Sequence, residues 1–434
     1  MELDEMILVS VDDHTIEPPD LFRGRVPKKY DDEAPKVVRT EDGVDMWVYA
    51  GIPRPQIGIN AVAGRPREEY GFEPSAYADM RPGTYDVHER VKDMSAAGVL
   101  GSMCFPSFPR FCGQFFAEAP DVGLARAVVE AYNDWHIEEW AGAYPDRFIP
   151  LSIPKLWSAE ECAAEVRRVA AKGCHAVSFS ENPAALGLAS LHHNSWDPFW
   201  QACEDEGTVV CMHIGSSSQT PVTASDAPID VTFVLSPVSI VSAAADVLFS
   251  PIFRKFPNIK FALSEGGIGW VPYFLERVDY VYDHHHAWTG ADFGGRLPSE
   301  VFLERFITCF VDDAFGVESR SHLNLDLVTW ECDYPHSDSN WPDAPEILAD
   351  RLAGVPDDEI DKITHLNAMR EFRFDPFSVR PRDRSTVGAL RAEVAGHDVT
   401  IRAKGTKAGK PVGATAGQLT ATFRPEVPVR VGED

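Results

Sequence analysis

Eight short apolar segments, separated mostly by stretches with helical periodicity, constrain the fold of this chain more than any other feature. Their near-continuous apolar and β-branched character is typical of parallel strands buried on both faces. The segments are residues 7–11, 99–105, 148–153, 175–180, 209–213, 259–265, 306–311 and 327–333. Eight such strands predict a closed (β/α)₈ barrel of the TIM type, an α/β fold. An open doubly wound sheet is the alternative, but no Gly-x-Gly-x-x-Gly motif follows an early strand to support it.

Helical periodicity fills most of the gaps between these segments. Helices are predicted at residues 86–97, 121–143, 158–171, 198–206, 238–250, 271–284 and 345–374. The last of them would close the barrel, so we expect a catalytic domain over residues 1–377.

Two parts of the chain fall outside the alternating pattern. Residues 22–84 form a long insertion rich in Pro, Gly and charge, in which segments 36–39 and 45–49 flank an Asp-Gly turn and predict a β-hairpin. An insertion of this length predicts a cover for the barrel mouth or a subunit contact. Residues 378–434 predict a C-terminal extension with edge strands at 399–402 and 419–423, which could contact a neighbouring subunit.

The charge balance and the cysteines narrow the classes of partner and compartment. The 67 acidic residues exceed the 40 basic ones, giving a net charge of -27. This argues against nucleic acid or an anionic membrane as a partner, because both require a positive surface. No run of 18 apolar residues and no signal-peptide pattern is present, and the eight scattered cysteines form no Cys-x-x-Cys pair. We therefore expect a cytoplasmic protein without a disulfide framework.

Polar side chains follow the predicted strands at the end where barrel enzymes carry their chemistry. Because side chains alternate along a strand, Asp12 and His14 point to the same face. The other strand-end residues are Glu181, His213, Glu265 and Asp333. Each has an ordinary structural explanation by itself, such as a core histidine or a turn cap. Together, two imidazoles and two carboxylates are a suitable ligand set for Zn²⁺ or another divalent first-row metal, and their summed charge of about zero tolerates burial.

The motifs around these residues resemble the amidohydrolase superfamily. The closer likeness is to the amidohydrolase 2 branch, which is related to aminocarboxymuconate-semialdehyde decarboxylase and resorcylate-type decarboxylases. The likeness runs from Ile7 to Phe374, and its motifs are Asp12-x-His14, Val210-Cys211-Met212-His213, Ser264-Glu265-Gly266-Gly267 and Cys332-Asp333-Tyr334-Pro335-His336, with Asn367 in the closing helix. The resemblance implies a distorted barrel whose metal ligands are Asp12, His14, His213 and Asp333.

Two departures from the branch bear on the reaction. Asp12 stands where many relatives have a histidine, although a carboxylate keeps a ligand there. Glu265 stands where the decarboxylases resemble one another in having a histidine. The fourth strand also lacks the lysine that bridges two metals in the classical hydrolases, so one metal is favoured, with Glu181 or Glu265 as the bridging residue of a second.

The resemblance implies a metal-dependent decarboxylase or hydrolase that acts on a small carboxylic acid. We expect zinc, with manganese or iron as alternatives, and catalytic roles for Asp333, Glu265 and His213, with Glu265 or Asp333 moving the proton. Arg110 and His336 are candidates for substrate binding, beside an aromatic run at 105–111 that would line the pocket.

Two other functions remain open. One is a dinuclear-iron oxygenase or hydroxylase that uses Glu181 and Glu265. The other is a non-catalytic metal-binding partner subunit of a hetero-oligomer, whereas the enzyme itself is expected to be a homo-oligomer. The histidine pair at 192–193 and the histidine triplet at 284–286 are interpreted as solvent-exposed surface.

Overall fold

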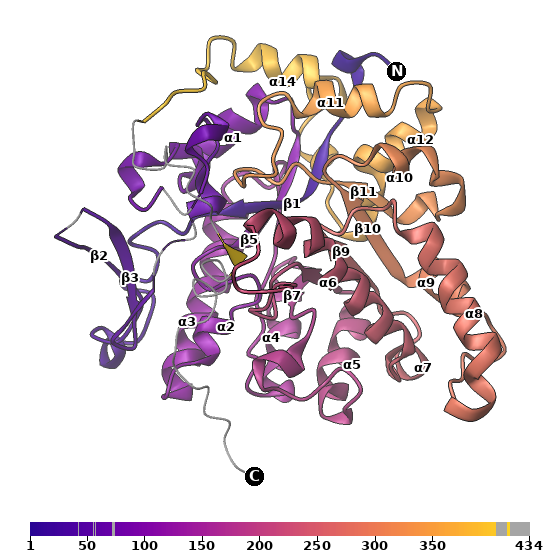
Figure 1. Ribbon diagram of the computed structural model, residues 1–434. Helices are drawn as coiled ribbons and strands as arrows, with labels where there is room; N and C mark the ends of the chain where they lie inside the picture. Colours follow the sequence, from indigo (N-terminus) through magenta and orange to yellow (C-terminus); the bar gives the residue numbers. More distant parts are fainter. Residues whose placement is uncertain (42, 55, 57, 72–73, 405–414, 417–434) are drawn as a thin grey trace.

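Eight parallel strands form a single sheet at the centre of the molecule (Figure 1). The computed structural model describes residues 1–41, 43–54, 56, 58–71, 74–404 and 415–416. The strands of this sheet are β1 (Val9–Thr15), β5 (Gly101–Pro106), β6 (Phe148–Ile149), β7 (Ala176–Phe179), β8 (Val209–His213), β9 (Phe261–Ser264), β10 (Phe306–Phe310) and β11 (Val328–Trp330). Each overlaps one of the eight predicted segments, and the α/β barrel class is confirmed.

The strands are ordered β6-β5-β1-β11-β10-β9-β8-β7, so β6 and β7 are the two ends of the sheet. Between these ends the described residues form one parallel bridge, Ser152 with Val177, beyond the end of β6. The sheet is therefore a barrel whose β6–β7 side lacks a continuous ladder. The ladder between β1 and β5 also has an irregularity, because its register shifts between Ser10 and Asp13. Such bulges re-aim side chains next to active sites.

Helices surround the sheet on its outer face (Figure 1). The α-helices are α1 (Val87–Ala96), α2 (Gln114–Ala117), α3 (Val122–Trp135), α4 (Ala159–Ala170), α5 (Asp197–Glu206), α6 (Ile229–Phe249), α7 (Ile252–Lys255), α8 (Val271–Thr289), α9 (Pro298–Arg305), α10 (Ala314–Glu318), α11 (Ala344–Arg351), α12 (Asp357–Asp361), α13 (Asn367–Glu371) and α14 (Val387–Glu393). Local sequence sets several ends: Ser158 Oγ accepts the Glu161 N–H at the start of α4, and Gly207, at φ 60°, ends α5.

The single helix predicted at 345–374 is wrong, because α11, α12 and α13 are separate helices and residues 352–356 between the first two are not helical. Helix α6 begins nine residues before its predicted start at residue 238. Pro237 lies inside this helix, although a proline usually indicates a helix end. Phe233 and Val234 before it are exposed, so the first turns also lack an amphipathic pattern. The length and apolar composition of α6 would allow it to cross a membrane. Helices in the core of soluble proteins can have the same length and composition.

The insertion carries a small antiparallel sheet of its own, at the left of Figure 1. Its strands are β2 (Lys36–Arg39), β3 (Asp45–Tyr49) and β4 (Ile52–Arg54). Residues 36–39 pair antiparallel with 45–48, so the predicted hairpin is present. Trp47 of β3 stacks on Phe108, in the loop after β5, with ring centroids 4.3 Å apart. The insertion is thus packed against the barrel through buried aromatic side chains.

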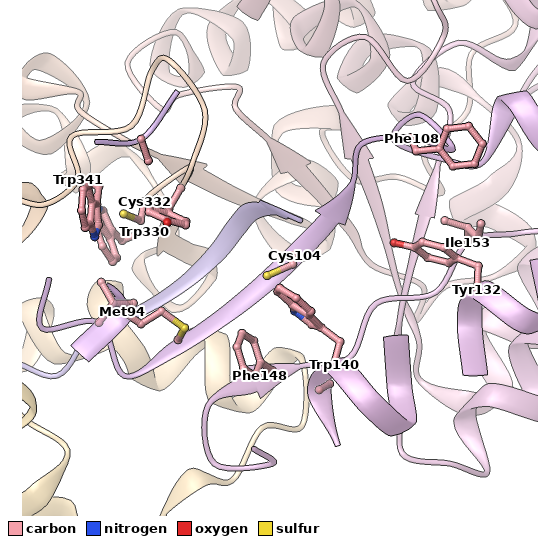
Figure 2. Close-up of a cluster of buried hydrophobic side chains, with 14 of the residues drawn as sticks. Met94, Cys104, Phe108, Tyr132, Trp140, Phe148, Ile153, Trp330, Cys332 and Trp341 are labelled. Atoms are coloured by element: carbon pink, nitrogen blue, oxygen red, sulfur yellow. The ribbon is translucent and has the colours of Figure 1, made fainter. Parts of the chain in front are cut away.

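Much of the apolar core lies between the strands and the covering helices, and a further cluster joins side chains of β1, β5, β8 and β10 to one another. Figure 2 shows part of one cluster, in which Cys104 of β5 lies near Trp140 and Phe148. All eight cysteines, which lie in the described part of the chain, are buried and free.

The extension begins with a helix, which the sequence reasoning missed. Val387 of α14 donates its N–H to the Met6 carbonyl, and Leu390 is fully buried. The strand predicted at 399–402 is wrong, because this segment has no ladder partner within the described residues and Arg402 N–H instead donates to the carbonyl of Gly64 in the insertion. The strand predicted at 419–423 lies outside the described residues.

Candidate metal centre

Six side chains from the carboxyl ends of four strands converge on one small region. They form two groups that share His14, and within each group the candidate ligand atoms lie within 4.8 Å of one another. The first group is His14, Glu265, Asp333 and His336, and the second is Asp12, His14 and His213. The structure therefore brings together all four residues that the resemblance implies as ligands, although strands β1, β8 and β11 are far apart in sequence.

The distances within the cluster are those of side chains that face a common centre. His14 Nε2 lies 3.0 Å from Asp333 Oδ1, and His213 Nε2 lies 3.4 Å from Asp12 Oδ2. Glu265 Oε1 lies 3.7 Å from both imidazole Nε2 atoms. The side chains of Asp12, His14 and Asp333 have no exposed surface, and that of Glu265 is 14% exposed.

The unsatisfied atoms of this cluster are what a metal ion would bind. Within the described chain, both Asp12 oxygens, His14 Nε2, His213 Nε2 and Asp333 Oδ1 are buried without a hydrogen-bond partner. A buried polar atom without a partner is costly, and a buried carboxylate more so. A divalent cation would satisfy these atoms together and neutralise the carboxylates, so the donor set fits a metal.

The hydrogen bond on the far side of His213 selects the tautomer that can bind a metal. His213 Nδ1 lies 2.7 Å from the Ile214 carbonyl oxygen, which can only accept. The proton is therefore on Nδ1, and the lone pair of Nε2 faces the cluster. Burial lowers the pKa of His213 to about 4, which keeps the ring neutral.

The carboxylates of the cluster crowd one another. Burial, followed by the charges of Glu331, Glu265 and Asp333, raises the pKa of Asp12 well above its usual range. Glu265 differs, because His213, His14 and His336 outweigh its burial and hold its pKa below the usual range. The cluster as it stands carries an excess of acidic groups, which a bound cation would offset.

Two of the carboxylates stand on strained backbone. Glu265 and Asp333 have φ angles of 57° and 59°, in the left-handed region that side-chain-bearing residues seldom adopt. Each follows the end of a strand, and the left-handed turn directs its side chain into the cluster instead of along the strand. Such strain is concentrated at functional sites and needs support from its surroundings.

A small cavity of about 120 Å³ opens beside the cluster. Glu265 and His336 line it, together with Phe111 after β5 and Phe233 of α6. Ile59 and Asn60, from the insertion, also line it, so the insertion helps to form the pocket wall. His336 Nδ1 lies 2.7 Å from Asp333 Oδ2 and 3.6 Å from Glu265 Oε1, which places this residue between the candidate ligands and the cavity.

Glu181 and Arg110 lie apart from the cluster. The Glu181 carboxylate accepts hydrogen bonds from the Gly215 and Ser217 N–H groups and from the Ser216 and Ser217 hydroxyls, so it organises the loop after β8. Arg110 is buried with its guanidinium over the Phe115 ring at 4.6 Å, and burial lowers its pKa to about 9. Neither is in the two ligand groups, and Arg110 is not among the described residues that line the cavity.

Sequence reasoning missed Glu331, which is fully buried beneath the cluster. Its Oε2 accepts the Glu265 N–H at 3.3 Å, and burial raises its pKa well above the usual range. Period-two alternation places residue 331 on the same face as Asp333, so the alternation pattern of the strand could have identified Glu331.

Sequence reasoning also missed Glu17. Its carboxylate accepts the N–H groups of Ser107 and Phe108 and so holds the aromatic loop after β5.

Comparison with known proteins gives one family and a set of similar folds. The family model described as Amidohydrolase matches residues 44–374. A solved amidohydrolase from Mycobacterium avium subsp. paratuberculosis K-10 is 19% identical, with a TM-score of 0.62 over 84% of this chain and 99% of that one. The 5-carboxyvanillate decarboxylase from Sphingomonas paucimobilis is also 19% identical, with a TM-score of 0.59 over 85% of this chain and 100% of its own.

A third similar structure carries a metal. It is a dihydroxybenzoic acid decarboxylase from Polaromonas sp. JS666 with bound manganese and 2-nitroresorcinol, 16% identical, with a TM-score of 0.57 over 86% of this chain and 98% of that one. The search of curated protein sequences returned no match.

Proposed function

Because this chain belongs to the amidohydrolase family, we propose that it is a metal-dependent decarboxylase of a small carboxylic acid. The observation that carries the proposal is the set of buried, unsatisfied ligand atoms from Asp12, His14, His213 and Asp333 beside a cavity. Two of the three similar folds are decarboxylases of aromatic acids, and this likeness supports the class of reaction.

In this proposal Asp12, His14, His213 and Asp333 hold one divalent ion, zinc or else manganese or iron. When bound, the ion supplies positive charge for the carboxylate or phenolate oxygens of the substrate. His336 faces the cavity from its hydrogen bond with Asp333 and orients the substrate there. The Phe111 and Phe233 side chains exclude water from the carbon that loses CO₂.

Glu265 is the proposed proton carrier. Its Oε1 has no hydrogen-bond partner in the described chain, and the residue lines the cavity. The neighbouring imidazoles hold its pKa low, so the group is ionised and, once protonated, is a strong acid. The carboxylate takes a proton from a substrate hydroxyl group and gives it readily to the carbon from which CO₂ leaves. The same arrangement would serve hydrolysis, in which the proton goes to the leaving group, so the product distinguishes the two reactions.

Of the two residues predicted to bridge a second metal, Glu265 lies in the cluster and Glu181 does not. Glu181 is engaged in four hydrogen bonds to the loop at 215–217, and no described contact connects it with the ligand atoms. We therefore propose one metal ion per chain.

The buried free cysteines support a reducing, cytoplasmic location. We also propose that the chain forms a homo-oligomer.

The test combines a metal assay with a substrate screen. The chain is purified without chelators, its metal content is measured, and hydroxybenzoates and semialdehyde carboxylic acids are screened for CO₂ release. We expect about one divalent ion per chain and CO₂ release that a chelator abolishes and Zn²⁺ or Mn²⁺ restores. Bound iron with O₂ consumption would indicate an oxygenase, and bound metal without any turnover would indicate a non-catalytic subunit.

A further inference from the structure

Asp93 of α1 is a buried junction between four separate parts of the chain. Its side chain is 2% exposed. Arg81, from the end of the insertion, donates through Nε to Oδ2 at 2.7 Å and through a terminal nitrogen to Oδ1 at 2.6 Å. The Tyr334 hydroxyl donates to Oδ2 at 2.6 Å, and His397 Nε2 lies 2.7 Å from Oδ1. A terminal nitrogen of Arg81 also lies 3.1 Å from His397 Nε2. Because the contact with Asp93 is the shorter of the two and a carboxylate only accepts, we place the proton on this nitrogen of His397.

Tyr334 connects this junction to the candidate metal centre. Its N–H donates to Asp13 Oδ1 at 2.9 Å, and its carbonyl accepts the His14 N–H at 2.7 Å. It directly follows Asp333, whose strained backbone is held by a hydrogen bond from its N–H to the Asp12 carbonyl at 2.8 Å. A displacement of Tyr334 would therefore move the backbone of both Asp333 and His14.

His397 belongs to a part of the chain that the family model does not cover, because the match ends at residue 374. The segment around it is attached to the insertion at several points. Arg81 donates to the Asp398 carbonyl at 2.7 Å, Arg402 N–H donates to the Gly64 carbonyl, and Lys404 N–H donates to Glu69 Oε2. Trp341, shown near Cys332 in Figure 2, covers the junction and donates its Nε1–H to the Asp93 carbonyl.

We propose that the C-terminal extension is a working part of the metal centre, with His397 as a positioning residue that acts through Asp93 and Tyr334. The inference rests on the metal site of the proposed function and adds a residue outside the matched family segment. Without His397, Arg81 is the remaining hydrogen-bond donor to Asp93 Oδ1 among the described residues. The space left by the imidazole also lets water reach the junction. The Asp93–Tyr334 contact then loosens, and with it the geometry of Asp333 and His14. Outer partners of metal ligands typically change metal affinity by about 10- to 100-fold.

The test is the affinity of the full-length chain for Zn²⁺ and Mn²⁺, measured by competition with a chromophoric chelator, without any substrate. His397→Leu removes the donor, and His397→Gln keeps an N–H donor near the position of Nε2. Arg391→Ala is the matched control, because it releases the extension at another point, its ion pair with Glu346, and leaves the junction intact. We expect His397→Leu to weaken binding by about tenfold, and we expect His397→Gln and Arg391→Ala to stay within about twofold of the wild type.

Three outcomes would overturn the inference. The first is His397→Leu with wild-type affinity, measured at a temperature at which all four proteins are folded. The second is an equal loss in Arg391→Ala, which would show that the extension acts only by general stabilisation. The third is a wild-type chain that binds neither ion, which would overturn the proposed function as well, whereas the first two leave that function untouched.

Discussion

The Phe111 ring lies nearly parallel to the His213 imidazole, with ring centroids 4.1 Å apart and 19° between the planes. The same imidazole is held at Nδ1 by the Ile214 carbonyl. The two contacts restrict its rotation, so that Nε2 is directed at the cluster before any ion binds. A ligand that is already oriented loses little conformational freedom on binding, and Phe111 also lines the cavity beside it.

We predict that Phe111→Leu weakens metal binding several-fold and raises the KM of the substrate found in the screen. The smaller side chain no longer stacks on His213, and the pocket wall recedes. The measurement is metal titration followed by steady-state kinetics. Phe116→Leu is the matched control, since Phe116 is also buried but contacts Phe108 and Tyr49 instead of the cluster. Equal effects of the two substitutions would assign the loss to packing alone.

His213→Ala and Asp333→Asn are each expected to reduce the bound metal to well below one ion per chain. The first removes a nitrogen ligand, and the second exchanges a charged oxygen ligand for a neutral amide. Metal analysis of the purified proteins gives the result, and His193→Ala, which removes an exposed imidazole, should keep the full content. Full metal content in both site variants would show that the ion, if any, binds elsewhere.

For Glu265→Gln we expect a kcat lowered by about a hundredfold or more, the usual contribution of a proton-transferring group. The substitution keeps the size of the side chain and removes its ability to exchange a proton. The metal content, measured on the same samples, should remain near that of the wild type, because Asp12, His14, His213 and Asp333 are intact. Loss of the metal would instead make Glu265 a ligand.

The stability of the fold should fall in acid because of His136. Its Nε2 lies 3.1 Å from the Cys104 carbonyl and its Nδ1 accepts the Leu151 N–H, so the ring is held neutral. Burial lowers the pKa of His136 from 6.5 to about 4. Between these values the unfolded chain binds the proton and the folded chain does not. The free energy of unfolding therefore falls as the pH drops from 6.5 to 4, by roughly 3 kcal/mol from this residue.

His136→Gln supplies the comparison for this prediction, because an amide can replace both hydrogen bonds but does not titrate. Denaturant unfolding of the two proteins at several pH values measures the difference between their stabilities. That difference should shift in favour of the variant below pH 6.5. A difference that is independent of pH would contradict the prediction.

The loops and ends of the chain show where sequence reasoning stopped. Arg110 was a candidate for substrate binding, but the loop after β5 turns it, at φ 64°, onto the Phe115 ring. The carboxylate of Glu181 is used by a loop 34 to 36 residues further along the chain. Both outcomes depend on where distant backbone N–H groups and aromatic rings lie, and no local pattern contains that information.

Within the sequence, the periodicity of apolar residues determined the eight strands, most of the helices and the strand ends that carry polar residues. Periodicity is sufficient there because burial of one face of a strand or helix is encoded within a few neighbouring positions. The interrupted ladder between β6 and β7, the left-handed turns at Glu265 and Asp333 and the junction at Asp93 were decided only by the tertiary structure. These features arise from contacts between residues as far apart as Asp93 and His397, whose free energies depend on the packing of the whole chain.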